Sequence, residues 1–299
     1  MAAAVALRRS GIDDLVLIEA DDGVGGTWRR NTYPGAACDI QSHLYSFSFA
    51  QNRSWSRTYA RQPEILAYLE SVADAMDLRR HLVLGTRLRE ARWNPATTKW
   101  DLVLDRAGLA TSMSVDAVVS AVGLFGAPKL PDIPGLADFG GPIMHTAQWD
   151  SSVPVQGRRV AVIGTGASAV QVVPELAKVA GSVTVFQRTP PWMVPKDDRA
   201  YSAAELARFR RNPLAVRQSR WRIWKLQHDF TANRGDDPTA AARSKVATDF
   251  LERTVADEEL RRALTPEYPF RCKRVLLGDD YYRALQRDMS IEDMSKLLA

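Results

Sequence analysis

A strand, a glycine-rich turn and a helix follow one another in residues 159–180, and this order constrains the fold more than any other feature. The apolar run Arg159–Ile163 is typical of a buried parallel strand. Residues 164–169 have the spacing G-x-G-x-x-A at the start of a predicted helix, and a second strand is predicted at Ser182–Phe186. The sequence therefore predicts a βαβ unit of a dinucleotide-binding domain.

The small residues of this turn suit it to hold a phosphate. Gly164 permits the tight turn, Gly166 allows a pyrophosphate to approach the backbone, and Ala169 lets the helix pack on the strand. Free N–H groups at the start of the helix face the phosphate charge. The predicted dinucleotide contacts in this region are Gly164, Thr165, Gly166, Ala167, Ser168, Ala169, Val170 and Gln171.

The end of the second strand indicates which nicotinamide nucleotide is bound. It reads Gln187-Arg188-Thr189, with no Asp or Glu. A carboxylate here would accept the ribose hydroxyls of NAD, whereas the guanidinium of Arg188 offers a bidentate contact to a 2′-phosphate. We therefore predict NADP(H), bound through Arg188 and Thr189. In the alternative, Arg188 is an ordinary surface residue and Gln187 contacts the ribose.

The first residues have the order of the second part of another dinucleotide-binding unit. A short helix over Ala2–Ser10 ends at Gly11, and the apolar run Leu15–Ile18 is predicted as a buried parallel strand. Glu19 follows, where such a unit has an acid that accepts ribose hydroxyls; the alternative is an ordinary acid at a strand end. We expect the first strand and its G-x-G-x-x-G turn to be missing from this half.

A stretch rich in glycine and aromatic residues follows, from Gly23 to Tyr45. Its glycines let the backbone lie against a ligand, and Trp28 and Tyr45 offer apolar faces with a polar edge. A plain surface loop rarely has so many large apolar residues. The stretch therefore predicts a cofactor contact, and the alternative is a buried loop whose aromatic side chains fill a core.

Further elements are predicted in the first part of the chain. A helix from Gln62 to about Asp77 has one apolar face, and short strands at 81–84, 87–93 and 99–105 form an antiparallel meander. The apolar run Val115–Val122 is predicted as a strand that could return to the parallel sheet. Helices are predicted from Tyr201 to Leu264 and a strand at Arg271–Leu277. Residues 288–299 are predicted as a polar, helix-like tail.

These elements give an α/β fold class with two Rossmann-like dinucleotide-binding domains, a small β-meander and a helical insertion. Residues 1–135 are predicted as a partial, incomplete FAD-binding domain and 136–155 as a linker. Residues 156–270 form the complete NADP-binding domain with its helical insertion. Residues 271–299 are predicted to return toward the FAD domain and to be truncated there.

Composition excludes several other classes of protein. The net charge of +5 comes from scattered arginines, whereas nucleic-acid binding proteins cluster theirs, so we expect no nucleic-acid partner. The 2 cysteines and 4 histidines have no metal-ligand spacing, and we expect no metal site. No apolar run reaches the roughly 18 residues that a membrane span needs. The protein is therefore expected in the cytoplasm, without a membrane partner.

The linker has a more specific pattern. Residues 139–150 match F-x-G-x-x-x-H-x-x-x-W-[P/D] at every fixed position, namely Phe139, Gly141, His145, Trp149 and Asp150. This pattern resembles the fingerprint of Baeyer–Villiger monooxygenases. Motifs similar to that family also occur in the expected order at 26–28, 33–39, 44–47, 187–189 and 273–274. The resemblance extends from Ala2 to about Arg287 and implies a family member truncated at both ends.

The resemblance implies an enzyme that uses FAD, NADPH and O2 to insert one oxygen atom beside a ketone carbonyl, which gives an ester or lactone. Arg274 matches the active-site arginine, whose permanent charge stabilises developing anions, and Asp39 matches the carboxylate that positions it. Lys273 and Arg188 match contacts to the 2′-phosphate. The FAD-binding positions implied are Glu19, Gly26, Thr27, Trp28, Asp39 and Tyr45.

His145 resembles a linker residue that organises domain motion, and we expect a hydrogen-bonded structural histidine. Arg271 departs from the family, which commonly has a small residue at this place.

Two other functions also agree with these motifs. The first is an N- or S-hydroxylating flavin monooxygenase, which shares a shorter form of the fingerprint. The second is a non-catalytic NADP-binding remnant. For residues 1–299 alone we expect weak or no retention of FAD.

Overall fold

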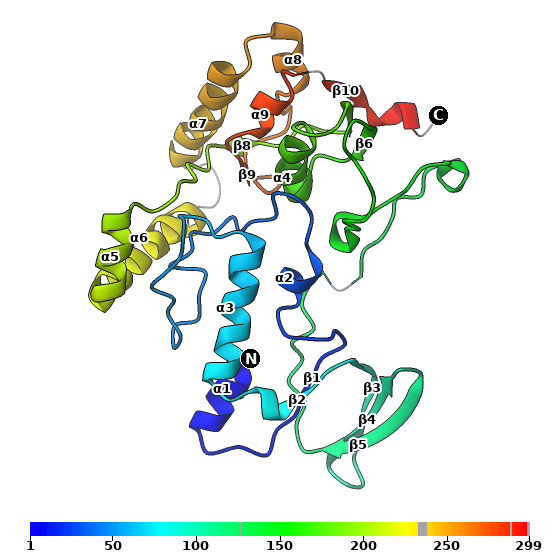
Figure 1. The fold of residues 1–299 in the computed structure, drawn as a ribbon, viewed down its shortest axis with the longest axis vertical. Helices are drawn as coiled ribbons and strands as arrows, with labels where there is room; N and C mark the ends of the chain where they lie inside the picture. Colours follow the sequence, from blue (N-terminus) through cyan, green and yellow to red (C-terminus); the bar gives the residue numbers. More distant parts are fainter. Residues whose placement is uncertain (126, 233–237, 288, 298–299) are drawn as a thin grey trace. The chain divides into compact units, whose positions relative to one another are not determined.

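The computed structural model describes residues 1–125, 127–232, 238–287 and 289–297, which form two compact units (Figure 1). The first unit comprises Met1–Arg30 and Pro63–Pro128, and the second comprises Asn31–Gln62 and Lys129–Ala299. Both units combine helices with strands, so the predicted α/β class is confirmed.

The first unit opens with the predicted helix and strand. Helix α1 (Ala2–Arg9) is followed by Gly11, whose positive φ of 85° suits a residue just beyond a helix end. Strand β1 (Leu17–Ile18) pairs in parallel with β2 (Leu82–Val83). Only the last two residues of the predicted strand Leu15–Ile18 are therefore strand. The helical elements of this unit are α2 (Thr27–Arg30), α3 (Gln62–Ala75) and the 3₁₀ turn η1 (Arg79–His81).

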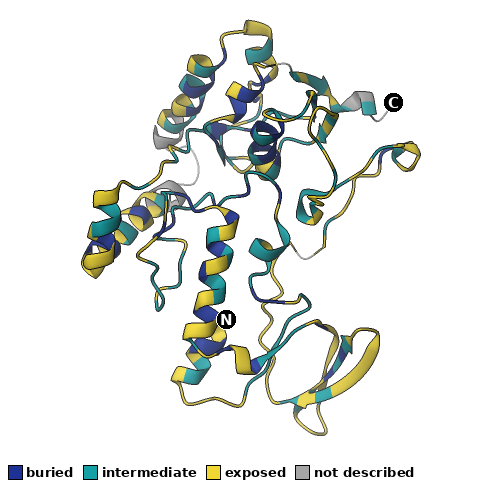
Figure 2. Cartoon of the chain, viewed as in Figure 1, coloured by how far each residue is buried: buried dark blue, intermediate teal, exposed yellow. Residues whose placement is uncertain are grey.

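An antiparallel sheet completes the first unit. Its strands are β3 (Thr86–Asn94), β4 (Lys99–Arg106) and β5 (Leu109–Val115), in the order β3-β4-β5. The central strand β4 buries Leu102 and Leu104, whereas β3 and β5 are mostly exposed (Figure 2). The predicted antiparallel meander is confirmed for the strands at 87–93 and 99–105. The predicted strand at 81–84 is wrong as a member of it, because β2 pairs in parallel with β1. The third strand of the sheet is β5, which the sequence analysis did not predict.

The prediction of a strand at Val115–Val122 is wrong. Residues 117–124 are in no strand, and Val119 and Val122 are 62% and 80% exposed. A strand requires a neighbouring backbone to hydrogen-bond with. In this unit β1 and β2 pair with each other, and the meander ends with β5 at Val115. The apolar composition of the run therefore did not suffice to make it a strand.

A parallel sheet forms the centre of the second unit. Strand β6 (Arg159–Ile163), helix α4 (Ala167–Leu176) and strand β7 (Ser182–Gln187) form the predicted βαβ unit. Alternate residues of β7, including Val183 and Val185, are buried, as is most of the inner face of α4. The helix was expected to extend to residue 180, but it ends at Leu176 and a turn follows.

A third strand in this sheet corrects the predicted helix-like tail. Strand β10 (Met289–Asp293) pairs in parallel with β7, which gives the order β10-β7-β6, and the 3₁₀ turn η4 (Met294–Leu297) follows. Met289 and Ile291 pack against the core and alternate with polar residues, a period of two that favours a strand. The tail residues Asp288, Leu298 and Ala299 lie outside the described residues.

The helical insertion is confirmed, with four helices among its described residues. They are α5 (Ala203–Arg211), α6 (Pro213–Ala232), α7 (Pro238–Thr254) and α8 (Glu258–Ala263). Short parallel strands β8 (Met193–Val194) and β9 (Leu276–Leu277) flank the insertion, and α9 (Tyr281–Ala284) follows β9. The predicted strand Arg271–Leu277 is therefore limited to its last two residues. Two 3₁₀ turns, η2 (Leu136–Asp138) and η3 (Thr146–Gln148), precede the sheet.

A loop at residues 33–37 is bound to α4 through one side chain. Gln171 accepts hydrogen bonds from the Tyr33 hydroxyl (2.9 Å) and the Ala37 N–H (3.3 Å), and its amide donates to the Ala37 carbonyl (2.9 Å). Gly35 lies at a φ of 83°, and a Cβ there would lie 2.4 Å from the Gln171 carbonyl oxygen. Only glycine fits this position without displacing the loop or the helix.

We predict that Gly35→Ala destabilises the protein more than Gly157→Ala does. Both glycines have a positive φ, and an L side chain there costs about 1–2 kcal/mol. A Cβ at Gly157 meets open space, whereas the clash at Gly35 adds about 1–3 kcal/mol. Urea unfolding of the two variants measures the difference. Equal losses would mean that the loop does not pack on α4 as closely as the structure has it.

Candidate cofactor and active site

The glycine-rich turn after β6 has the geometry that a dinucleotide phosphate requires. Gly164 has a φ of 98°, and no heavy atom lies within 4 Å of a Cβ built at Gly164 or Gly166. Helix α4 begins directly after it at Ala167, while Ala169 and Val170 are buried against the core. The Thr165 hydroxyl donates to the Thr189 carbonyl (3.1 Å), which ties the turn to the residues after β7. The space beside Gly164 and Gly166 is therefore open, while the hydrogen bond to Thr189 fixes the position of the turn.

The residues at the end of β7 bear on which of the two predicted residues, Arg188 or Gln187, contacts a bound nucleotide. Gln187 is buried, and its amide donates to the Ala263 carbonyl at the end of α8 (2.8 Å). Its side chain thus faces the protein interior. Arg188, the next residue, is exposed. This arrangement favours Arg188 over Gln187 as the group that meets a bound nucleotide.

Arg274 and Asp39 form an ion pair, although 235 positions separate them in the sequence. Nη2 of Arg274 donates to Oδ2 of Asp39. The Arg274 side chain is 62% exposed and that of Asp39 is 30% exposed. The neighbouring Lys273 is exposed, and its ammonium lies over the Tyr268 ring, 4.6 Å from the ring centre. The structure brings together the two residues predicted as catalytic and leaves the guanidinium accessible.

The loop that bears Tyr45 is held by helix α6. The guanidinium of Arg220 donates to the carbonyls of His43 (3.1 Å), Leu44 (2.9 Å) and Ser46 (2.9 Å). Nδ1 of His43 lies 2.9 Å from the Ser219 hydroxyl. Tyr45 itself is 39% exposed at the tip of this loop. The sequence analysis missed Arg220, because no local motif signals a contact across about 175 residues.

His43 is a buried aromatic neighbour of this loop. Its ring stacks on Tyr201 and meets the edge of Phe209, with ring centres 5.4 Å and 4.4 Å apart. Nε2 of His43 is buried without a hydrogen-bond partner. Burial lowers the pKa of His43 from 6.5 to about 4, because a charged imidazolium would lose its hydration there. His43 is therefore neutral near pH 7.

The other predicted FAD contacts belong to the first unit. Glu19 follows β1, and its carboxylate accepts the N–H of Asp21 (3.0 Å). Thr27 and Trp28 begin helix α2, directly after Gly25 and Gly26, which both have a positive φ. A Cβ at Gly25 would lie 2.5 Å from Leu66. The loop between strand β1 and helix α2 is therefore closely packed at Gly25.

The fingerprint residues of the linker make local contacts. A Cβ at Gly141 would lie 2.7 Å from the Phe139 ring, so the ring packs where only glycine leaves room. Nδ1 of His145 accepts the N–H of Ala147 (3.1 Å) and caps η3, which agrees with a structural histidine. Trp149 packs against the core of the second unit. Asp150 accepts the Ser152 N–H and hydroxyl, and these hydrogen bonds lower the pKa of Asp150.

Two features of the described residues lie apart from these side chains. A hollow of about 280 Å³ lies between α7, α8 and Tyr282, and none of the predicted site residues lines it. Within the described ranges, no group of three or more His, Cys, Asp or Glu side chains could hold a metal ion. The candidate site therefore consists of the open turn, Arg188 and the Arg274–Asp39 pair, all in the second unit.

Comparison with known families agrees with this geometry. The model of the family "Flavin-binding monooxygenase-like" matches residues 39–221, more than half of the chain. The model "NAD(P)-binding Rossmann-like domain" matches residues 1–62. The chain belongs to the flavin-binding monooxygenase-like family. Both the predicted dinucleotide-binding units and the predicted resemblance are thereby confirmed.

Individual relatives are more specific. The chain is 43% identical over 291 residues to a Baeyer–Villiger monooxygenase of Streptomyces coelicolor, covering 96% of this chain and 55% of the relative. It is 43% identical over 283 residues to one of Pseudomonas aeruginosa, covering 94% and 53%. The chain thus spans about half the length of the curated relatives it matches.

Solved structures show the same relationship. Cyclohexanone monooxygenase from Rhodococcus sp. Phi1, bound to NADP+, has a TM-score of 0.83 and 32% identity, covering 98% of this chain and 62% of that one. An oxidised steroid monooxygenase bound to NADP has a TM-score of 0.82 and 30% identity, covering 99% and 63%. Among the residues described here, no helix is long and apolar enough to cross a membrane.

We predict that His43 makes the protein less stable in acid. The unfolded chain binds a proton at His43 from about pH 6.5, whereas the folded protein does so only near pH 4. Between these values the unfolded state binds more protons, so the free energy of unfolding falls as pH falls, by up to about 1.4 kcal/mol per pH unit.

The His43→Gln variant should lose this part of the pH dependence, while His228→Gln, at an exposed position on α6, should keep it. Urea unfolding at pH 7.5, 6 and 5 measures the slopes. Equal slopes in the unsubstituted protein and in His43→Gln would contradict the prediction.

Proposed function

We propose that this protein is part of an FAD- and NADPH-dependent monooxygenase that inserts one oxygen atom beside a ketone carbonyl to give an ester or lactone. The contact between Arg274 and Asp39 is the observation that carries the proposal. Such a reaction passes through negatively charged oxygen species, and a guanidinium keeps its charge at any working pH. Relatives named Baeyer–Villiger monooxygenases support the reaction class.

The predicted catalytic and NADP-binding residues each have a defined role in the proposed reaction. Arg274 offers its remaining N–H groups to an anionic oxygen, and Asp39 fixes the orientation of the guanidinium. The turn at Gly164–Ala169 and the start of α4 bind the pyrophosphate of NADPH, with Val170 and Gln171 supporting the turn from the helix. Arg188, with Thr189 and Lys273, binds the 2′-phosphate. FAD, when bound, supplies the activation of O2.

We also propose contacts between FAD and the residues predicted for it. Glu19 accepts the ribose hydroxyls, Gly26 and Thr27 present backbone N–H groups, and Trp28 and Tyr45 offer aromatic faces. We further propose the division into an FAD-binding domain at 1–135, a linker at 136–155, an NADP-binding domain at 156–270 and a return at 271–299. Cys38 and Cys272 are both free thiols, which favours the reducing cytoplasm as the compartment.

The proposal is tested by supplying the purified protein with FAD, NADPH, O2 and two substrates together, a cyclic ketone and an alkyl amine. We expect a lactone as the product, with its added oxygen derived from ¹⁸O2. Oxygenation of the amine alone would favour N-hydroxylation. NADP binding without flavin binding or product would favour a nucleotide-binding remnant.

Replacement of the proposed catalytic arginine should separate the two halves of the reaction. We expect Arg274→Ala to lower lactone formation by at least about 100-fold, the effect of removing one group that stabilises a developing anion. NADPH oxidation should continue, because the nucleotide site is unchanged. Product analysis alongside NADPH absorbance measures both rates, with the exposed Arg208→Ala as control. Undiminished lactone formation would refute the assignment.

Replacement of Arg188 should change the choice of nucleotide. A charge-assisted hydrogen bond contributes about 1.5–3 kcal/mol, so Arg188→Ala should weaken NADPH binding by roughly 10–100-fold. NADH has no 2′-phosphate, and its affinity should change by less than about threefold. Titration of each nucleotide by calorimetry measures the effect, again with Arg208→Ala as control. Equal losses for both nucleotides would exclude contact with the phosphate.

A further inference from the structure

Four chain segments lie side by side around the Arg274–Asp39 pair. Strands β8 and β9 place residues 192–194 beside residues 276–278, with the Leu276 N–H donating to the Trp192 carbonyl (2.8 Å). Farther along, the Thr58 N–H donates to the Arg199 carbonyl (2.9 Å). The Cys38 N–H in turn donates to the Ala60 carbonyl (3.0 Å). The backbone that bears Arg274 is thus connected, through two intervening segments, to the backbone that bears Asp39.

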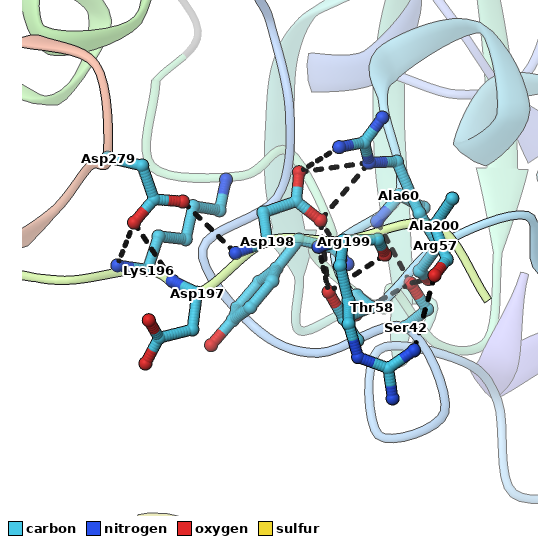
Figure 3. A network of polar contacts seen from close by, with 11 residues as sticks. Ser42, Arg57, Thr58, Ala60, Lys196, Asp197, Asp198, Arg199, Ala200 and Asp279 are labelled. Atoms are coloured by element: carbon cyan, nitrogen blue, oxygen red, sulfur yellow. Dashed lines mark hydrogen bonds and ion pairs between the residues drawn. The ribbon is translucent and has the colours of Figure 1, made fainter. Parts of the chain in front are cut away.

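The first connection is made by the carboxylate of Asp279, five residues after Arg274. Its two oxygens accept the N–H groups of three consecutive residues, Lys196 (2.8 Å), Asp197 (3.0 Å) and Asp198 (3.0 Å) (Figure 3). Asp197 has a φ of 51°, which an L residue adopts only at a cost. The Asp279 carboxylate offsets this cost by satisfying three backbone donors, and so fixes the turn that presents Asp198.

The second connection is made by the Asp198 side chain. It forms an ion pair with Arg57 (2.7 Å) and also accepts the Thr58 hydroxyl (3.0 Å) and the Tyr59 N–H (3.3 Å). The side chains of Asp198 and Arg57 are only 15% and 23% exposed. A partly buried, bidentate pair with further hydrogen bonds is much less screened by water than a surface pair.

The third connection is made by the buried hydroxyl of Ser42. It accepts the Ala60 N–H (2.9 Å) and lies within hydrogen-bond distance of the Arg57 carbonyl (2.9 Å) and the Thr58 carbonyl (3.0 Å). Residues 57–60 are therefore held on one side by Asp198 and on the other by the segment that contains Asp39. Lys196 adds a positive charge between these segments, with its ammonium over the Tyr59 ring and attracted to Asp39, Asp198 and Asp279.

The Arg274–Asp39 pair itself cannot hold this geometry. Its guanidinium is mostly exposed, and an exposed ion pair contributes only about 0–1 kcal/mol. We infer that Asp279 and Asp198 are positioning residues, which fix the Asp39 segment against the Arg274 segment so that the pair is formed before substrate arrives. This inference rests on the proposed function for its role in the reaction, while the positioning itself is a property of this chain.

Cys38 is a built-in reporter of the positioning, because it directly precedes Asp39 and its thiol is buried. In a Cys272→Ser background, we expect Asp198→Asn and Asp279→Asn to increase the rate of Cys38 labelling by a thiol reagent at least about tenfold. Asp249→Asn, which removes an exposed pair with Lys245 on α7, is the matched control and should change the rate by less than about twofold.

A milder variant guards against loss of the fold. Thr58→Val removes the hydroxyl that binds both Asp198 and the Arg199 N–H (3.0 Å) without changing a charge, and it should also accelerate labelling. Circular dichroism confirms that each variant is folded before labelling. Unchanged Cys38 rates in all three variants would overturn the positioning role.

The reaction provides a second readout that a merely structural role would not change. With FAD, NADPH and a cyclic ketone, the variants should form less lactone per NADPH oxidised, by at least about threefold, and correspondingly more H2O2. Faster labelling with an unchanged lactone yield per NADPH would overturn the role in the reaction. If the unsubstituted protein forms no lactone, the proposed function fails, and the labelling rates alone then decide whether the network positions Asp39.

Discussion

The ion pair between Arg274 and Asp39 depends on the long-range contacts that hold residues 33–60, and it contributes little stability itself. Fixing the backbone costs about 1–2 kcal/mol for each residue ordered, whereas a mostly exposed ion pair returns at most about 1 kcal/mol. Its geometry must therefore come from elsewhere. Buried and partly buried contacts determine the geometry. Gln171 binds residues 33–37, and Ser42 and Asp198 bind residues 57–60.

The exposure of Arg274 is also a condition for its proposed chemistry. A guanidinium has five N–H donors, and the contact to Asp39 is made through Nη2. A fully enclosed and paired arginine would have no donor left for an anionic oxygen. An arginine without any carboxylate would sample many rotamers and lose the preorganisation that makes such donors effective. The single carboxylate of Asp39, on a backbone held in place, orients the guanidinium and still leaves donors for an anionic oxygen.

The sequence predicted what is local and missed what is long-range. The turn at Gly164–Ala169, the helix that begins at Gln62 and two strands of the meander were predicted because short-range spacing determines them. The apolar run Val115–Val122 was misread as a strand, because strand formation depends on a partner that composition does not reveal. Strand β10 was missed for a related reason. Its two apolar residues, Met289 and Ile291, are too few to predict a strand, and the strand forms because β7 offers a backbone to pair with.

The candidate site shows the same division. The resemblance predicted that Arg274 and Asp39 act together, and the structure places them in contact. It gave no indication of Arg220 or Asp198, whose side chains bind residues more than 130 positions away. Arginine and aspartate are common on protein surfaces, so their identity alone does not distinguish a solvated side chain from one that holds a loop.

Residues 31–62 show how these long-range contacts determine the organisation of the protein. In sequence they interrupt the first unit, yet they belong to the second. Helix α4 holds one end through Gln171, and α6 holds the loop that bears Tyr45 through Arg220. The predicted FAD contacts are consequently divided between units, with Glu19, Thr27 and Trp28 in one and Asp39 and Tyr45 in the other. Contacts made inside the second unit therefore hold Asp39 together with Arg274 and the NADP-binding turn.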